Sequence, residues 1–297
     1  MSFLEYCLDN NIKIKQNEIM SSHTSFKIGG AADYYLECGE IETLKAVIKA
    51  ANEYKIPYFI LGKGTNILVS DNGFRGLVIC LAGFDKITRD GLTVTAGAGV
   101  SIAKLCMYLC ENSLSGLTFA YGIPGSVGGA LYMNAGAYGG EISQFAVSAT
   151  VLDKSGNIKE ILKQDMNLGY RTSIFKTDGD TILSVKFALK QGEKDKIKTE
   201  MDDYMSKRKS KQPLEYGSAG STFKRPEGYF AGTLIENAGL KGVTVGGAMV
   251  SEKHAGFIIN YDNATANDVK ELMKKVQTEV YKKYGVNLEP EVILVGE

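Results

Sequence analysis

Histidine is scarce in this chain of 297 residues, which contains only His23 and His254. Two imidazoles leave little scope for a metal site built on histidine, so we expect no metal. Cys106 and Cys110 are four residues apart on a predicted helix, which is compatible with a metal or redox pair. Buried small apolar residues on one helix face are the favoured interpretation. The chain has an odd number of cysteines and no CxxC spacing, which fits a protein of the reducing cytoplasm. The five are Cys7, Cys38, Cys80, Cys106 and Cys110.

Net charge and long hydrophobic runs are also absent. Lys and Arg number 34 and Asp and Glu number 34, so no whole-molecule field favours nucleic acid or an anionic membrane. Uninterrupted apolar runs such as residues 77–82 are too short to cross a bilayer. The first ten residues carry two acids and no apolar segment, so we expect no secretory signal there. These absences predict a cytoplasmic protein that enters no membrane, binds no nucleic acid and binds anions only locally.

Proline is rare, with five residues, whereas glycine has 34. Glycine is needed where the backbone takes a positive φ or approaches a ligand closely, so clusters of glycine are candidate sites. Hydrophobic residues make up 44% of the chain and charged residues 23%, an ordinary balance for a globular protein. The length suits two or three compact domains.

Helix and strand patterns predict an α+β protein of three units, residues 1–80, 81–205 and 206–297. The first has apolar residues at helical spacing after Glu40, then strand-like runs at 58–61, 67–69 and 76–79. The second has strand-like runs at 92–96, 149–152 and 181–185, a helix from Ser101, and a glycine-rich tract at 116–142.

The charged segment 194–211 predicts a helix or linker at the boundary of the third unit. Thr265 and Asp268 form a capping box at the start of a final helix with an apolar stripe. Residues 292–295 predict a short buried strand, which is able to return to the first unit.

The first candidate site is a loop with alternating glycines after the strand at 58–61. Its backbone N–H groups and short polar side chains suit a diphosphate. The spacing matches neither the dinucleotide fingerprint nor the P-loop, and a plain hairpin turn explains it equally well. The loop contains Gly62, Lys63, Gly64, Thr65, Asn66, Ile67 and Leu68.

The second candidate is the tract between Tyr121 and Gly140, which contains seven glycines. Turns do not require so many, and the largely apolar remainder argues against a flexible linker. Backbone packed against a flat, rigid ligand is the favoured explanation, because a ring needs close approach and main-chain donors at its edge. Tight internal packing is the alternative.

The third candidate is Ser221, in the segment 217–226. It lacks the GxSxG elbow and neither histidine has a triad context, so a serine hydrolase is disfavoured. A hydroxyl can donate a proton to a reactive carbanion, and a phosphate-binding or capping serine is an equally good explanation. Arg171 lies in a polar turn and Glu291 opens the last strand; each taken alone indicates a surface charge.

Together these segments resemble the UDP-N-acetylenolpyruvoylglucosamine reductase (UDP-N-acetylmuramate dehydrogenase) family. The similarity begins at TSFKIGG, residues 24–30, and covers nearly the whole chain. The short stretch between Arg171 and Ser221 resembles the subclass without an extra tyrosine-bearing loop. Five further motifs follow in the family's order: LGKGTNILVSD, GIPGSVGGALYMNAGAYGGEI, YRTSIF, KQPLEYGSAGSTFKRP and LEPEV.

The resemblance implies a bipartite FAD-binding fold of the vanillyl-alcohol oxidase type in residues 1–80 and 81–205. A C-terminal α/β substrate-binding domain is implied for 206–297. FAD is expected to bind non-covalently, with its diphosphate on residues 62–68. The isoalloxazine ring and ribityl chain are expected along Gly122, Ile123, Pro124, Gly125, Ser126, Gly128, Gly129, Ala130, Asn134, Ala135, Gly136 and Tyr138.

The implied activity is NADPH-dependent, FAD-mediated reduction of UDP-N-acetylglucosamine enolpyruvate to UDP-N-acetylmuramate, in peptidoglycan precursor synthesis. Arg171 would stabilise the enolate, Glu291 would assist, and Ser221 would donate the proton. We also expect a monomer. The residues expected to contact the UDP-sugar are Tyr170, Lys211, Lys224 and Arg225.

Two other functions compete with this one. Another non-covalent flavin oxidoreductase of the same fold, such as an alcohol oxidase, is the first; residues 62–68 contain no His or Cys for covalent attachment, which counts against that example. A non-catalytic nucleotide-binding protein is the second, and it would not need Arg171, Ser221 and Glu291 together. The cluster Lys207, Arg208, Lys209 and Lys211 suits a 2′-phosphate or the UDP diphosphate, although its first three residues are better explained as a solvated helix end.

Overall fold

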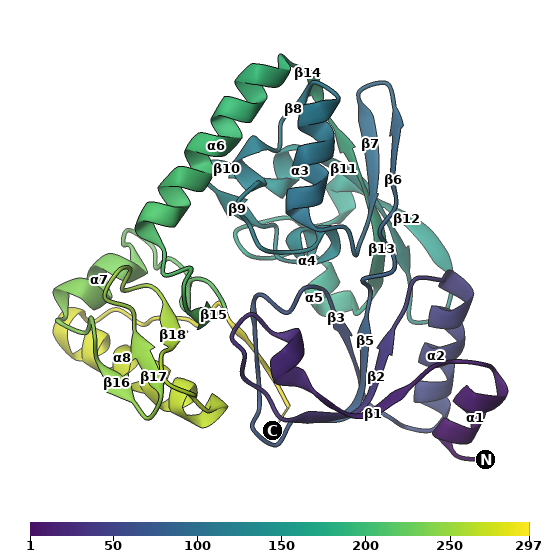
Figure 1. Cartoon of the computed structure of the whole chain (residues 1–297), viewed down its shortest axis with the longest axis horizontal. Helices are drawn as coiled ribbons and strands as arrows, with labels where there is room; N and C mark the ends of the chain where they lie inside the picture. Colours follow the sequence, from purple (N-terminus) through teal and green to yellow (C-terminus); the bar gives the residue numbers. More distant parts are fainter. Residues whose placement is uncertain (297) are drawn as a thin grey trace. The chain divides into compact units, whose positions relative to one another are not determined.

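The structure is a computed structural model that describes residues 1–296, and its contacts divide the chain into two compact units. The first comprises Met1–Lys15, Tyr35–Lys63 and Gly76–Arg208; the second comprises Gln16–Tyr34, Gly64–Arg75 and Lys209–Glu297. Helices and strands are mixed in both, as expected (Figure 1). The finer division into 1–80, 81–205 and 206–297 stays a prediction.

One sheet has the strand order β1 (Lys15–Ile19), β2 (Ala31–Glu37), β5 (Phe74–Cys80), β3 (Tyr58–Leu61). β3 runs parallel to β5, with Tyr58 opposite Leu77 and Leu61 opposite Cys80. Parallel strands are normally covered on both faces, which explains their continuous apolar runs. The expected helix is α2 (Ile41–Glu53), and its apolar residues are buried. An additional helix, α1 (Phe3–Asp9), packs against α2 through the rings of Phe3 and Tyr54.

The larger sheet of the first unit is antiparallel. Helix α3 (Ile102–Glu111) begins at its N-cap Ser101, as expected. Helix α4 (Val127–Tyr132) lies in the glycine-rich tract, where its two glycines hide the helical pattern, and it packs against the sheet. The strand order is β12 (Ile158–Leu162), β11 (Ala146–Leu152), β13 (Thr181–Ala188), β7 (Thr93–Gly97), β6 (Ile87–Asp90).

The charged segment 194–211 is a helix, α6 (Lys194–Lys211), and not a linker (Figure 1). It buries only Ile197 and Met201, which accounts for its charged composition. The shorter strands and α-helix of the first unit are β8 (Leu114–Ser115), β9 (Gly136–Ala137), β10 (Gly140–Glu141), α5 (Phe175–Asp178) and β14 (Lys190–Gln191). Its short 3-10 helices are η2 (Thr118–Ala120), η3 (Ile142–Gln144) and η4 (Lys163–Asp165).

All five cysteines are buried and free, which confirms the apolar interpretation of Cys106 and Cys110. Burial raises the pKa of Cys106 to about 12 and that of Cys7 to about 11, because the thiolate loses its hydration. These thiols are therefore neutral at physiological pH.

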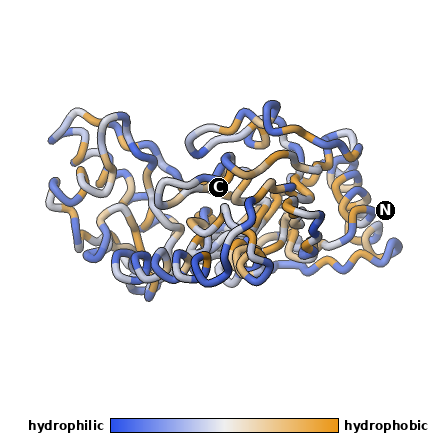
Figure 2. The backbone as a smooth tube through the Cα atoms, turned by 90° about the horizontal axis from the view of Figure 1, so that it is seen from above, coloured by the Kyte–Doolittle hydropathy of each residue, from blue (hydrophilic) through white to orange (hydrophobic). Residues whose placement is uncertain are grey.

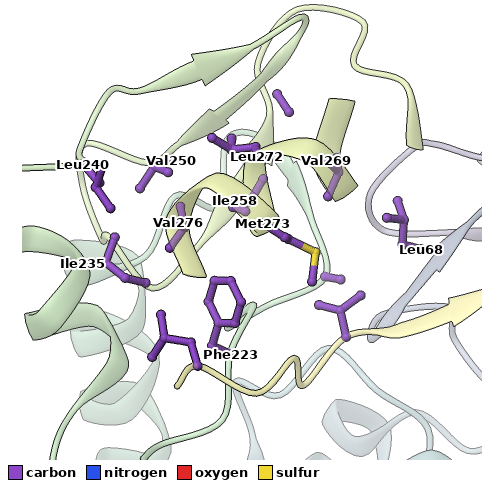
Figure 3. Packing of buried hydrophobic residues seen from close by; sticks show 14 of the residues in the cluster. Leu68, Phe223, Ile235, Leu240, Val250, Ile258, Val269, Leu272, Met273 and Val276 are labelled. Carbon is purple, nitrogen blue, oxygen red and sulfur yellow. The ribbon is translucent and has the colours of Figure 1, made fainter. Parts of the chain in front are cut away.

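The second unit packs a small sheet against helices α7 (Ala231–Asn237) and α8 (Ala266–Tyr284). Figure 3 shows Val269, Leu272, Met273 and Val276 of α8 in the core that also contains Phe223. The capping box of Thr265 and Asp268 is present, which confirms the predicted helix start. The sheet order is β15 (Gly217–Ser218), β18 (Ile258–Asn260), β17 (Ala248–Val250), β16 (Thr244–Val245).

The last strand, β19 (Ile293–Val295), pairs in parallel with β4 (Ile67–Val69). This pairing returns the end of the chain to the strand that follows the glycine loop at residues 62–66. Hydrophobic residues are spread in short stretches along the backbone (Figure 2). Among residues 1–296, no helix combines the length and apolar character required to cross a membrane.

Candidate active site

The loop at residues 62–66 leaves its backbone donors unused. None of its five N–H groups donates a hydrogen bond to a described residue, whereas the carbonyls of Gly64 and Asn66 accept from Ser25 and Ile293, at 3.0 Å each. Gly64 must be glycine, because its φ is +63° and a Cβ would lie 2.0 Å from the carbonyl oxygen of His23. Consecutive unpaired N–H groups make a concave donor surface for an anion, so this loop fits a diphosphate.

The glycine-rich tract contains glycines in two kinds of surroundings. A Cβ on Gly128 would lie 2.9 Å from Cβ of Ala98, so internal packing requires glycine at that position. Gly129 is exposed, and a Cβ there would meet only Oγ of Ser126, at 3.4 Å. Packing within the protein therefore does not explain Gly129, whereas close approach of a ligand does.

The first glycine of the loop touches the same tract. A Cβ on Gly62 would lie 2.6 Å from Oγ of Ser126, so the absence of a side chain lets the two segments meet. Ser126 is buried and caps α4 by accepting a hydrogen bond from the N–H of Gly129 at 3.3 Å. The two expected parts of a cofactor site thus share one contact, at Gly62 and Ser126.

Arg171 occupies a tight two-residue turn. Gly169 and Thr172 exchange backbone hydrogen bonds at 3.2 Å, and Arg171 between them has a φ of 55°, an uncommon value for a side chain of this size. Its guanidinium donates to the carbonyl of Gly136 at 3.4 Å and lies 5.0 Å from the ring centre of Tyr170. Arg171 is half-buried, and these contacts engage its guanidinium.

Ser221 and Glu291 lie on two segments that pair with each other in the second unit. Phe223 and Pro290 form an antiparallel bridge, and the N–H of Glu291 donates to the carbonyl of Thr222 at 2.8 Å. The side chain of Asn66 donates to the carbonyl of Glu291 at 3.1 Å. This arrangement joins the serine and glutamate segments to the end of the glycine loop.

Thr222, which the sequence analysis overlooked, holds this arrangement in place. It is only 2% exposed, its N–H donates to the carbonyl of Gly256 at 2.8 Å, and its Oγ1 accepts from the N–H of Ile258 at 3.0 Å. Ser221, next to it, is exposed. The only sequence signal for Thr222 is its position directly after Ser221.

The four residues expected to contact a UDP-sugar have different surroundings. Tyr170 is 51% exposed and Lys211 is exposed. Lys224 forms an ion pair with Glu289. Arg225 is exposed and places its guanidinium 4.5 Å from the ring centre of Phe230.

The basic cluster on α6 is not uniformly solvated. Lys207 and Lys209 are exposed, and Lys207 forms an ion pair with Asp203 at 2.6 Å. Arg208 is half-buried, and a Cβ on Gly122 would lie 3.0 Å from its Cδ. Burial lowers the pKa of the Arg208 guanidinium from its ordinary value. The interpretation as a solvated helix end therefore fails for Arg208.

Two family models match the chain. One is described as an FAD binding domain and matches residues 32–162. The other is described as the C-terminal domain of UDP-N-acetylenolpyruvoylglucosamine reductase and matches residues 212–295. A UDP-N-acetylenolpyruvoylglucosamine reductase from Clostridium novyi (strain NT) is 50% identical over 294 residues, which is 99% of this chain and 95% of that protein.

Solved structures agree with this assignment. The crystal structure of UDP-N-acetylenolpyruvylglucosamine reductase from Thermus caldophilus has a TM-score of 0.83 and 34% identity, and covers 96% of this chain and 99% of that one. A variant of BBE-like 1 from Physcomitrella patens shares only the fold, with a TM-score of 0.51 and 12% identity over 64% of this chain and 44% of that one. The expected bipartite FAD-binding fold with a C-terminal domain is confirmed. The chain belongs to the UDP-N-acetylenolpyruvoylglucosamine reductase family.

Proposed function

We propose that this protein reduces UDP-N-acetylglucosamine enolpyruvate to UDP-N-acetylmuramate in peptidoglycan precursor synthesis. FAD is bound non-covalently and NADPH is the hydride donor. The observation that carries the proposal is the pairing of the Ser221 and Glu291 segments next to Asn66, at the end of a loop whose N–H groups are free for a diphosphate. The name of the relatives, UDP-N-acetylenolpyruvoylglucosamine reductase, supports this substrate.

The reaction adds a hydride and a proton across a carbon–carbon double bond, while NADPH loses a hydride and becomes NADP⁺. FAD, when bound, supplies the two-electron chemistry that accepts the hydride from one nucleotide and delivers it to the other. The hydride goes to the terminal carbon of the enolpyruvyl group, and negative charge then spreads onto the neighbouring carboxylate. The protein must stabilise this charge and deliver the proton.

Arg171 is assigned to the developing charge. Its turn and its bond to Gly136 hold the guanidinium before the reaction begins, so little reorganisation is needed when the enolate forms. Glu291 assists by hydrogen bonding or by placement of its charge.

Ser221 is assigned to the proton that completes the lactyl ether. A serine hydroxyl is a weak acid, but an enolate carbon is basic enough to take its proton from a fixed position. The buried Thr222 anchors the backbone beside it, which supports such positioning. The UDP-sugar contacts are assigned to Tyr170, Lys211, Lys224 and Arg225.

We further propose that the protein acts in the cytoplasm as a monomer and binds no nucleic acid. The balanced charge, 34 basic against 34 acidic residues, supports the last point.

An assay of NADPH consumption combined with mass spectrometry of the product tests the proposal. NADPH consumption by the yellow holoenzyme should rise strongly when the enolpyruvyl substrate is added, and mass spectrometry should show a product heavier than the substrate by two hydrogens. Oxidation of NADPH that is unaffected by the substrate, with oxygen as the acceptor, would identify a flavin oxidase and contradict the proposal.

A further inference from the structure

We propose that Asn134 is a positioning residue for Arg171, because its buried carboxamide fixes the turn that carries the guanidinium. This inference rests on the proposed role of Arg171. Asn134 was expected among the residues along the cofactor, but its side chain points to a different task. The role requires an amide and explains why this polar residue is completely inaccessible, with 0% exposure.

Both ends of the carboxamide have partners in the first unit. Nδ2 donates to the carbonyl of Gly169 at 2.9 Å, and Oδ1 accepts from the N–H of Ser143 at 2.9 Å. A side chain at this position must therefore donate and accept at once, which Leu or Ala cannot do and which a carboxyl does only when it is protonated. A part-buried donor or acceptor left without its hydrogen bond destabilises the folded arrangement, so both contacts matter.

The acceptor, Gly169, is the first residue of the turn that presents Arg171. The turn is not relaxed, because Arg171 takes a left-handed φ of 55° without being glycine. Such a conformation persists only when its surroundings over-determine it. Asn134 supplies part of that restraint from the start of the turn, and Lys176 supplies another part by donating to the carbonyl of Arg171 at 2.7 Å.

The segment 132–136, which contains Asn134, contacts the guanidinium of Arg171 as well as the turn that carries it. Asn134 follows Met133, the C-cap residue of α4, and has a φ of 41°, which redirects the chain after the helix. Two residues later, the carbonyl of Gly136 accepts from Arg171. Two residues after Arg171, the buried hydroxyl of Ser173 donates to the carbonyl of Tyr132 at 2.7 Å. Residues 132–136 therefore hold the Arg171 side chain directly and also contact Gly169 and Ser173, the residues two positions before and after it.

The test is a double-mutant cycle on the holoenzyme. Asn134→Leu keeps the approximate shape but has neither the donor to Gly169 nor the acceptor for Ser143; Asn134→Ala removes the same two groups and also the volume of the side chain. Each should slow reoxidation of the reduced enzyme by the enolpyruvyl substrate about 10- to 100-fold, with bleaching by NADPH changed less than about twofold. When either Asn134 substitution is added to Arg171→Ala, reoxidation should slow by less than about twofold relative to Arg171→Ala alone, because Asn134 acts through Arg171.

Ser148→Ala is the matched control, because Ser148 is also a buried polar residue of the first unit and donates to Glu160 at 2.6 Å. It should lower thermal stability without this coupling. Equal slowing by Asn134→Leu with Arg171 present or absent would overturn the inference, as would a fall in FAD content that accounts for the lost activity. If Asn134→Ala does not fold, Asn134→Leu, which leaves no cavity, decides the question. Failure of the wild-type protein to be reoxidised by substrate would instead contradict the proposed function.

Discussion

Gly129→Ala should separate cofactor binding from folding. The added Cβ meets only Oγ of Ser126, at 3.4 Å, which is ordinary contact, so the folded protein has room for it. Gly129 lies inside α4, where alanine is favoured over glycine by up to about 1 kcal/mol, so the free energy of unfolding should stay equal or rise. FAD should nevertheless bind more weakly, because the methyl group occupies the face along which the ring is proposed to lie.

The size of the FAD effect follows from overpacking, which costs about 1–3 kcal/mol when a methyl group intrudes into a close contact. At about 1.4 kcal/mol for each factor of ten, the dissociation constant should rise roughly 5- to 150-fold. Quenching of flavin fluorescence on titration of FAD into stripped protein measures this constant, and thermal unfolding of the stripped protein measures stability.

Gly128→Ala is the paired variant, because its Cβ would lie 2.9 Å from Cβ of Ala98 and should reduce stability before any cofactor is added. The opposite signs of the two stability changes identify which glycine serves packing. Normal FAD affinity in a stable Gly129→Ala protein would refute the assignment of this surface to the ring.

Three further predictions concern the charged residues Arg171 and Glu291, the serine Ser221, and the buried cysteines. Arg171→Ala should lower turnover about 10²–10³-fold with FAD content unchanged, and near-normal turnover would remove its assigned role; the same comparison applies to Glu291→Gln. Ser221→Ala should leave bleaching by NADPH close to normal and slow reoxidation by substrate about 10²–10⁴-fold in stopped-flow absorbance; equal slowing of both half-reactions would show that Ser221 is not the proton donor. The buried thiols, whose pKa reaches about 12 at Cys106, should not react with a thiol-specific disulfide reagent at neutral pH until the protein unfolds, and rapid reaction of the native protein would contradict the burial.

Periodic apolar patterns predicted the regular elements well, because α2, α3 and α8 bury one face and their stripes are direct traces of that burial. Helix α4 was not apparent, since two of its six residues are glycine and its position depends on contacts with Ala98 and the sheet. The pairing of β19 with β4 was only an open alternative, because three residues at the end of the chain cannot specify a distant partner.

Candidate residues for the site were predictable from the sequence, but the contacts that support them were not. Motifs identified Ser221, Arg171 and Glu291, but the burial of Thr222 and the double contact of Asn134 depend on segments far apart in the chain. Arg208 looked like one charge among four on a helix end, and only the position of Gly122 shows that it is half-buried. Long-range contacts of this kind leave no local pattern in a sequence.

The central claim is that one bound flavin carries hydride from NADPH to the enolpyruvyl substrate, and an anaerobic absorbance experiment tests it most directly. The purified protein should show the flavin bands near their usual wavelengths, and acid precipitation should release all of the colour as FAD. One equivalent of NADPH should bleach the bands, and one equivalent of UDP-N-acetylglucosamine enolpyruvate should restore them within the turnover time. A bleached protein that stays bleached with substrate and regains its colour only when oxygen is admitted would contradict the account.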